Sequence, residues 1–281
     1  MVKETTQLID IEKVINNKDP RLLKVLPGFL IRYLKRIIHQ EELNTFLSEH
    51  GHLEGLPFIR AALEMLEIKY HVIGKENIPK NGRFIFVSNH PLGGLDGLVF
   101  IQEVGTLFPD IKFPVNDLLL NIYNLNNIFL PVNKHGAQSR VAARAIEDAY
   151  ASESQILNFP AGLCSRKHSG VIMDIEWKKH FISKAVTYER DILPVFFSGR
   201  NSGFFYNLSN LRVFLGIKSN FEMIYLPHEM FKQKGKELTL IFGKPISYTL
   251  FDKSRTPVQW ADYVKKVVYN LGEKHKAALN I

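Results

Sequence analysis

The sequence predicts an α/β fold with a mixed, largely parallel sheet flanked by helices and a helical segment at the N-terminus. Between residues 67 and 200, short apolar runs rich in aromatic and β-branched residues alternate with helical patterns, which is typical of a layered α/β domain. The chain of 281 residues, 46% hydrophobic and 23% charged, is long enough for one large domain and a small appendage. We therefore expect a helical segment over residues 1–66 and an α/β domain over residues 67–281.

The expected elements follow one another along the chain. Residues 20–66 have the pattern of helices. The expected strands are short apolar runs over residues 68–73, 83–88, 111–114, 127–131, 155–159, 192–197 and 237–242. The expected helices cover residues 96–107, 136–152, 177–188 and 257–276. Because strands alternate with helices over most of this length, we expect a sheet that is largely parallel.

Composition narrows the classes of partner. An excess of 36 Lys and Arg over 28 Asp and Glu gives a net charge of +8, which attracts phospholipid surfaces, phosphorylated cofactors, acidic carrier proteins or nucleic acid. The cations are dispersed and no nucleic-acid reader motif occurs, so nucleic acid is not an expected partner. The single cysteine, Cys164, excludes an internal disulfide, and the ten scattered histidines have no ligand spacing, so no metal site is expected. The start lacks a signal-peptide core, and no apolar stretch is long enough to span a bilayer.

Residues 27–38 predict a strongly amphipathic helix. Apolar side chains fill one continuous arc, and Arg32, Lys35 and Arg36 fill the remainder. The pattern suits a helix packed on the core with a basic outer face, and equally an interfacial helix lying on an anionic membrane. A second apolar and aromatic segment, over residues 204–215, would either line an acyl groove or pack in the core, and we expect the core.

A histidine stands where one of the expected strands ends. His90 follows the strand over residues 83–88, and Asp96 comes after a glycine-bearing turn. A carboxylate can hold one ring nitrogen of a histidine, which fixes the tautomer and leaves the other nitrogen free to accept a proton. A turn histidine beside a helix-capping aspartate gives the same pattern. The pair therefore indicates a general base without establishing one.

Three further segments have residue types suited to binding. In residues 158–167, an apolar strand runs into proline and glycine, then into a hydroxyl and two cations. Gly162 lets the backbone approach a ligand closely, and Arg166 could hold a phosphate or a carboxylate, although a loop with solvated cations looks the same. Residues 128–134 form an apolar strand that ends in a lysine, and a later strand is interrupted by Pro194.

These four segments, in this order, resemble the four sequence blocks of the glycerolipid acyltransferase family, which includes the glycerol-phosphate and lysophosphatidate acyltransferases. The resemblance covers roughly residues 68–200, about half of the chain. In the family's first block, an asparagine precedes a histidine and an aspartate that are separated by four residues. Asn89, His90 and Asp96 match it, with five residues between the last two, and Gly93-Gly94 can absorb the extra residue within the turn.

The other blocks match with one departure. The second block is an apolar strand ending in a cation, here Lys134, and the fourth is an apolar residue beside a proline, here Pro194. The third block, Phe-Pro-Glu-Gly followed by Thr or Ser and Arg, is matched by Phe159, Pro160, Gly162, Ser165 and Arg166. Ala161 replaces its glutamate, which puts glycerol phosphate as the acceptor in doubt.

The resemblance implies an O-acyltransferase of membrane lipid biosynthesis. His90 would remove the proton of a lysolipid hydroxyl, which attacks the acyl thioester of coenzyme A or acyl carrier protein, and Asp96 would orient the imidazole. It implies no cofactor beyond the acyl donor. Substrate contacts would come from Asn89, Lys134, Gly162, Ser165 and Arg166.

The form Asn-His-Pro-Leu-Gly-Gly-Leu-Asp-Gly resembles a branch of that family, often labelled hemolysin-like, that O-acylates lyso forms of aminoacyl lipids such as ornithine or glycine lipids. Such acceptors carry a hydroxyl on a fatty chain and a carboxylate on an amino acid. The implied partners are the acyl donor, the lysolipid and an anionic membrane surface, with the protein peripheral on the cytoplasmic face of the inner membrane. A non-catalytic lipid-binding relative is the main alternative, and a nucleic-acid-binding protein is a weaker one.

Overall fold

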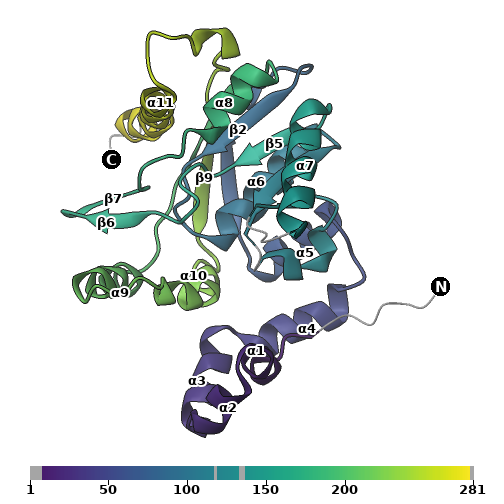
Figure 1. The fold of residues 1–281 in the computed structure, drawn as a ribbon, viewed down its shortest axis with the longest axis vertical. Coiled ribbons are helices and arrows are strands. Elements are labelled where there is room, and N and C mark those ends of the chain that lie inside the picture. The colour runs from purple at the N-terminus through teal and green to yellow at the C-terminus, as the bar shows by residue number, and fades with distance from the viewer. Residues whose placement is uncertain (1–7, 117–118, 133–136, 279–281) are drawn as a thin grey trace.

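A seven-stranded sheet in the order β1-β9-β8-β2-β5-β3-β4 forms the centre of the molecule (Figure 1). The computed structural model describes residues 8–116, 119–132 and 137–278. The strands of this sheet are β1 (Lys69–Ile73), β2 (Phe84–Ser88), β3 (Ile111–Val115), β4 (Phe129–Pro131), β5 (Gln155–Asn158), β8 (Asp191–Phe197) and β9 (Glu237–Phe242). A separate antiparallel hairpin consists of β6 (Arg166–His168) and β7 (Val171–Met173).

The sheet is mixed and largely parallel, as predicted. Neighbouring strands run parallel except for β8 and β9, which pair antiparallel. All seven expected strands are present, and β4 begins two residues later than expected because a 3-10 turn over Tyr123–Leu125 precedes it. Every side chain of β2 is buried, as is typical of a strand with helices on both sides.

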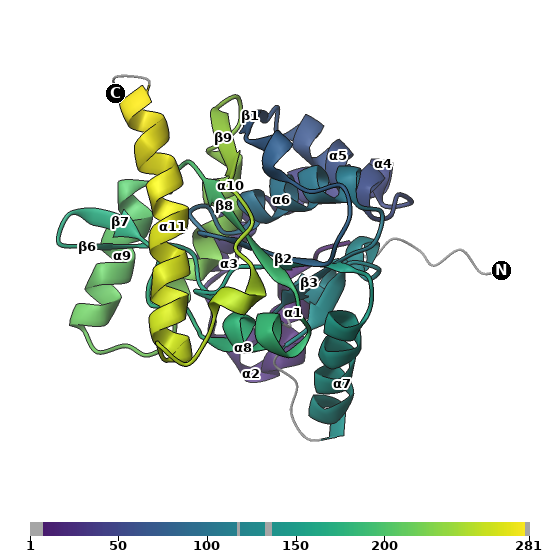
Figure 2. The same cartoon turned by 90° about the horizontal axis from the view of Figure 1, so that it is seen from above.

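The helices are α1 (Ile11–Lys18), α2 (Pro20–Val25), α3 (Gly28–Ile37), α4 (Gln40–His50), α5 (Leu56–Met65), α6 (Gly94–Leu107), α7 (Ala137–Ala151), α8 (His180–Thr187), α9 (Gly203–Phe214), α10 (Leu226–Phe231) and α11 (Pro257–Ala278). Alternate side chains of β2 divide the core into two layers. Phe84 and Phe86 pack in the layer that contains α5 and α6, whereas Ile85 and Val87 pack in the layer that contains α8 and α11. Figure 2 shows these helices on opposite faces of the sheet.

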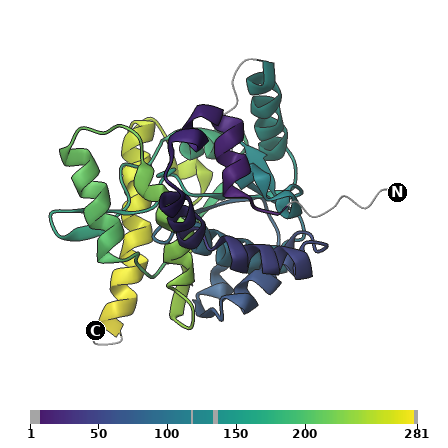
Figure 3. The same ribbon diagram turned by 90° about the horizontal axis from the view of Figure 1, so that it is seen from below.

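The N-terminal helices α1 to α4 project from one end of the molecule (Figure 1 and Figure 3). They meet the main body where the Tyr33 and Tyr225 hydroxyls lie 2.9 Å apart and where Nε2 of His39 lies 3.0 Å from Nδ1 of His228. Helix α5 instead packs within the core. The expected division between a helical segment and an α/β domain near residue 66 stays a prediction. Within the described ranges, no helix is both long and apolar enough to cross a membrane.

The apolar segment over residues 204–215, which we expected in the core, is helical and only partly covered. Phe205 at the start of α9 is fully buried, but Phe214 at its end is 85% exposed. Helix α3 is similar, because Ile37 is buried while Phe29 is 66% exposed. Both helices therefore leave apolar side chains in solvent on the lower side of the molecule in Figure 1.

A fully buried arginine fixes the end of α7. The guanidinium of Arg190 donates to the carbonyls of Tyr150 at 2.7 Å, Ser154 at 2.8 Å and Ala149 at 3.3 Å, and also to that of Ser152. Burial lowers the pKa of Arg190 to about 10, so the side chain stays charged at neutral pH. Its charge lies where the helix dipole is negative, which is a favourable place for a cation.

Replacing Arg190 with alanine should lower the free energy of unfolding by about 3 kcal/mol, because several buried carbonyls lose their donor. Arg144→Ala is the matched control, since that side chain lies on the same helix and is 86% exposed. Urea unfolding of both variants measures the difference. Equal stability of the two variants would contradict the role given to Arg190.

Candidate active site

His90 and Asp96 meet just beyond the end of β2. Nδ1 of His90 lies 2.9 Å from Oδ2 of Asp96, which stands in the first turn of α6. The chain between them turns at Gly93, whose φ of 86° favours glycine. A Cβ atom at this position would also lie 2.9 Å from Cδ2 of Leu226. The turn therefore brings the two side chains together although five residues separate them.

The carboxylate of Asp96 is fully buried and well supplied with donors. Its Oδ2 also accepts the backbone N–H of Leu92 at 2.9 Å, and its Oδ1 accepts that of Gly97 at 3.0 Å. The N-terminal turn of a helix favours a negative charge as well. Because an ionised carboxylate only accepts hydrogen bonds, Nδ1 of His90 carries the hydrogen and Nε2 has a free lone pair.

The imidazole of His90 is packed on one face and open at one edge. Its ring stacks on Phe159 with centroids 4.0 Å apart, and its side chain is 15% exposed. No hydrogen bond to Nε2 occurs among the residues that the structure describes. Burial alone lowers the pKa of His90, but the charges of Asp96 and Asp174 outweigh it and raise the pKa above 6.5.

Asp174, a residue that sequence reasoning missed, holds the backbone of His90. Its carboxylate accepts the backbone N–H of His90 at 3.2 Å, the Ser165 hydroxyl at 2.6 Å and Nε1–H of Trp177 at 2.9 Å. Ser165 also donates its own N–H to the carbonyl of His90 at 2.7 Å. Burial raises the pKa of Asp174. The Ser165 hydroxyl, expected as a substrate contact, is thus committed to a link between the third block and the histidine.

Arg166 has an internal partner. Its side chain is buried, and Nη2 lies 3.0 Å from Glu222, which also pairs with Arg212 at 2.9 Å. Nη1 donates to the carbonyl of Cys164 at 2.7 Å. A substrate contact of Arg166 stays a prediction, and the structure shows that its guanidinium shares one carboxylate with Arg212.

The remaining predicted residues have distinct settings. Asn89 clamps β2 to β8, because its Nδ2–H donates to the carbonyl of Phe197 at 2.9 Å and its Oδ1 accepts the N–H of Phe197 at 2.7 Å. Gly162 has a φ of 69°, and a Cβ atom there would lie 3.1 Å from Nζ of the exposed Lys178. Lys134 lies outside the described residues.

Cys164 lacks the properties of a nucleophile. It is 1% exposed, and burial raises its pKa to about 11. The side chain is therefore a neutral thiol at physiological pH, and the reactive form of cysteine is the thiolate.

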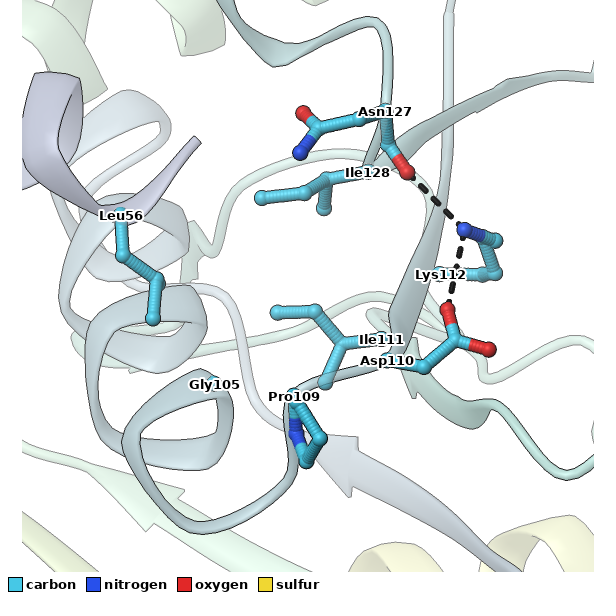
Figure 4. A pocket seen from close by; sticks show the side chains of 8 residues that line it. All are labelled: Leu56, Gly105, Pro109, Asp110, Ile111, Lys112, Asn127 and Ile128. Carbon is cyan, nitrogen blue, oxygen red and sulfur yellow. Dashed lines mark hydrogen bonds and ion pairs between the residues drawn. The ribbon is translucent and has the colours of Figure 1, made fainter. Parts of the chain in front are cut away.

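A cavity of about 280 Å³ lies away from the histidine, between α5, α6 and the start of β3 (Figure 4). It is lined by Leu56, Gly105, Pro109, Asp110, Ile111, Lys112, Asn127 and Ile128. Lys112 bridges Asp110 at 3.0 Å and the carbonyl of Asn127 at 2.9 Å. This cavity opens at the amino end of β3, and His90 follows the carboxyl end of the parallel strand β2. The cavity and the histidine therefore lie at opposite ends of the strands.

Comparison with known proteins identifies the family. A family model described as acyltransferase matches residues 13–278. The lyso-glycine lipid O-acyltransferase of Bacteroides thetaiotaomicron is 48% identical over 272 residues, which are 96% of this chain and 100% of that protein. That of Phocaeicola vulgatus is 47% identical over 96% of this chain and 98% of its own length.

A solved structure, that of the 1-acyl-sn-glycerophosphate (LPA) acyltransferase PlsC from Thermotoga maritima, is similar with a TM-score of 0.49 and 21% identity, over 95% of this chain and 92% of that chain. The family model covers most of the chain, and the two relatives match it over nearly their whole length. The chain therefore belongs to the acyltransferase family.

Proposed function

We propose that the protein transfers a fatty acyl group from a thioester of coenzyme A or acyl carrier protein to the hydroxyl of a lyso-aminoacyl lipid of the lyso-glycine type. The observation that carries this proposal is the His90–Asp96 contact of 2.9 Å in a chain of the acyltransferase family, with no partner for Nε2 of His90 among the described residues. The names of the two relatives at 48% and 47% identity support the acceptor. Ala161, fully buried, stands where a phosphoglycerol acyltransferase would have glutamate, which also favours a different head group.

The reaction balances with His90 alone as the proton carrier. Nε2 of His90 takes the proton of the acceptor hydroxyl, and the hydroxyl oxygen bonds to the carbonyl carbon of the thioester. The tetrahedral intermediate then loses the thiolate as the C–S bond breaks, and the proton passes from His90 to the sulfur. The imidazolium that forms in between is stabilised by the charge of Asp96 2.9 Å away. A positioned base of this kind contributes about 10² to 10⁴ in rate.

The intact pair also bears on the main alternative. A relative that only binds lipid has no need of a buried carboxylate that fixes one histidine tautomer. Asp96 is fully buried and accepts from two backbone N–H groups as well as from His90. This arrangement favours catalysis over lipid binding alone, and the family favours both over nucleic-acid binding.

We also propose that the enzyme binds peripherally to an anionic membrane, on the cytoplasmic face where acyl thioesters are made. The supporting observation is that α3 and α9 both carry exposed apolar side chains, which together we call the apolar surface. Phe29 and Phe214 are among its exposed side chains, and Tyr225 joins the two helices through its hydroxyl contact with Tyr33 and its ring contact with Phe204, 5.0 Å between centroids. Exposed aromatic side chains beside cations suit the interface of an anionic bilayer.

Acyl transfer should depend on His90. With a labelled acyl thioester of coenzyme A and of carrier protein, the wild type should acylate lyso-glycine lipid in preference to lysophosphatidate, and His90→Ala should reduce the rate by about 10² to 10⁴. His71→Ala, a variant at a 69% exposed histidine of β1, should act like the wild type. Substantial transfer by His90→Ala would refute the mechanism, and product from lysophosphatidate alone would refute the acceptor.

The pH profile should report the charge of Asp96. Because the base must be neutral, kcat/KM should rise with pH through a midpoint above 6.5, the ordinary histidine pKa. In Asp96→Asn the charge that raises this pKa is gone while burial still lowers it, so the residual activity should rise at a lower pH. An unchanged midpoint in this variant would show that Asp96 does not set the pKa of the base.

Membrane binding should need both helices of the apolar surface. Phe29→Asp and Phe214→Asp should each release protein from vesicles containing anionic lipid in co-sedimentation, because each places a charge in the bilayer interface. Val141→Asp, on α7 at a side chain that is 72% exposed, is the matched control and should bind as the wild type does. Equal binding of all three variants would contradict this membrane surface.

A further inference from the structure

One asparagine has a buried side-chain amide without a partner. Asn201 lies in the loop between β8 and α9 and is 4% exposed. In the part of the chain that the structure describes, neither Nδ2 nor Oδ1 of Asn201 has a hydrogen-bond partner. Unsatisfied buried polar groups are costly for folding and rare in native proteins, so a pair of them on one side chain calls for a function.

One set of contacts connects the loop of Asn201 to the turn that carries the catalytic pair. The loop leaves β8, whose end is joined to β2 by the side chain of Asn89. Gly199 in this loop packs against Leu92, because a Cβ atom on the glycine would lie 3.2 Å from Cδ1 of Leu92. Leu92 in turn donates its backbone N–H to Asp96. The loop and the turn that carries the aspartate are therefore in direct contact.

A second set of contacts connects Asn201 to the third sequence block. The backbone N–H of Asn201 donates to the hydroxyl of Tyr206 at 3.0 Å. Tyr206 packs with Cys164 in a small buried cluster, and the next residue, Ser165, donates its N–H to the carbonyl of His90. Asn201 thus lies between two segments that each touch the histidine or its aspartate.

The loop is held rigidly around Asn201. The next residue, Ser202, caps α9 and donates its hydroxyl at 2.7 Å to Glu229, a fully buried carboxylate. The preceding residue, Arg200, accepts a hydrogen bond from Gln233 at 3.4 Å. A backbone held in this way needs little further ordering when the side chain binds, which lowers the entropy lost on binding.

We propose that the amide of Asn201 binds the head group of the acceptor lipid, an inference that rests on the function proposed above. An aminoacyl head presents a carboxylate that accepts hydrogen bonds and an amide N–H that donates one. Nδ2 and Oδ1 of Asn201 supply one donor group and one acceptor to match them. The guanidinium of Arg166 already pairs with Glu222, whereas this amide has no partner among the described residues.

Steady-state kinetics of Asn201→Ala with lyso-glycine lipid tests the assignment. Loss of a hydrogen bond to a charged group should raise the acceptor KM by about tenfold to a hundredfold. Thioester hydrolysis measured without acceptor should stay within about twofold of the wild type, because the donor site and His90 are untouched. The melting temperature should be unchanged or higher, since the amide makes no hydrogen bond that folding would lose and its burial without a partner is unfavourable.

Two further variants complete the experiment. Asn201→Asp keeps the shape but opposes a carboxylate, so it should raise the acceptor KM at least as much, and Asn126→Ala at an exposed asparagine should have no effect. An unchanged acceptor KM in both Asn201 variants, or an equal loss of transfer and hydrolysis, would overturn the assignment while leaving the proposed function standing. Failure of the wild type to acylate the lyso-glycine lipid would overturn both.

Discussion

The active site depends on one buried carboxylate, that of Asp96, which decides what His90 can do. By accepting from Nδ1 it leaves Nε2 as a base, and its charge keeps the imidazolium stable while the proton is in transit. The turn that delivers it is tight enough to need glycine at position 93, and that turn lies against Leu226 of α10. Helix α10 also carries His228, which meets the N-terminal helices at His39. The catalytic turn and the proposed membrane surface are therefore in contact through a single short helix.

Most polar side chains around the site form hydrogen bonds or ion pairs with one another. Asp174 joins Ser165 to the backbone of His90, and Glu222 pairs with Arg166. Asp174 and Ser165 affect the histidine without touching substrate, because both hold the backbone of His90. A rigid constellation of this kind reduces the reorganisation required during reaction.

Local patterns predicted the fold well, and long-range partners explain what they left out. The strands were visible because each is a short apolar run between turns, and His90 and Asp96 because they share one turn. The internal partner of Arg166 could not be predicted, since Glu222 is 56 residues away in the chain. The hairpin of β6 and β7 was missed because its first strand is cationic and only three residues long. In α9, apolar residues on several sides gave no indication of which face would be exposed. A partnerless amide such as that of Asn201 is likewise visible only once its surroundings are known.

The protonation state of the His90 ring is the most direct test of this account. Among the ten histidines, the ¹⁵N resonances of His90 can be assigned in uniformly labelled enzyme by comparison with His90→Ala. The account predicts that at a pH above the pKa of the ring, Nδ1 carries the hydrogen and Nε2 does not, and that the pKa of the ring lies above 6.5. A ring protonated at Nε2 alone, or one that titrates below 6.5, would contradict the assignment of His90 as the base held by Asp96.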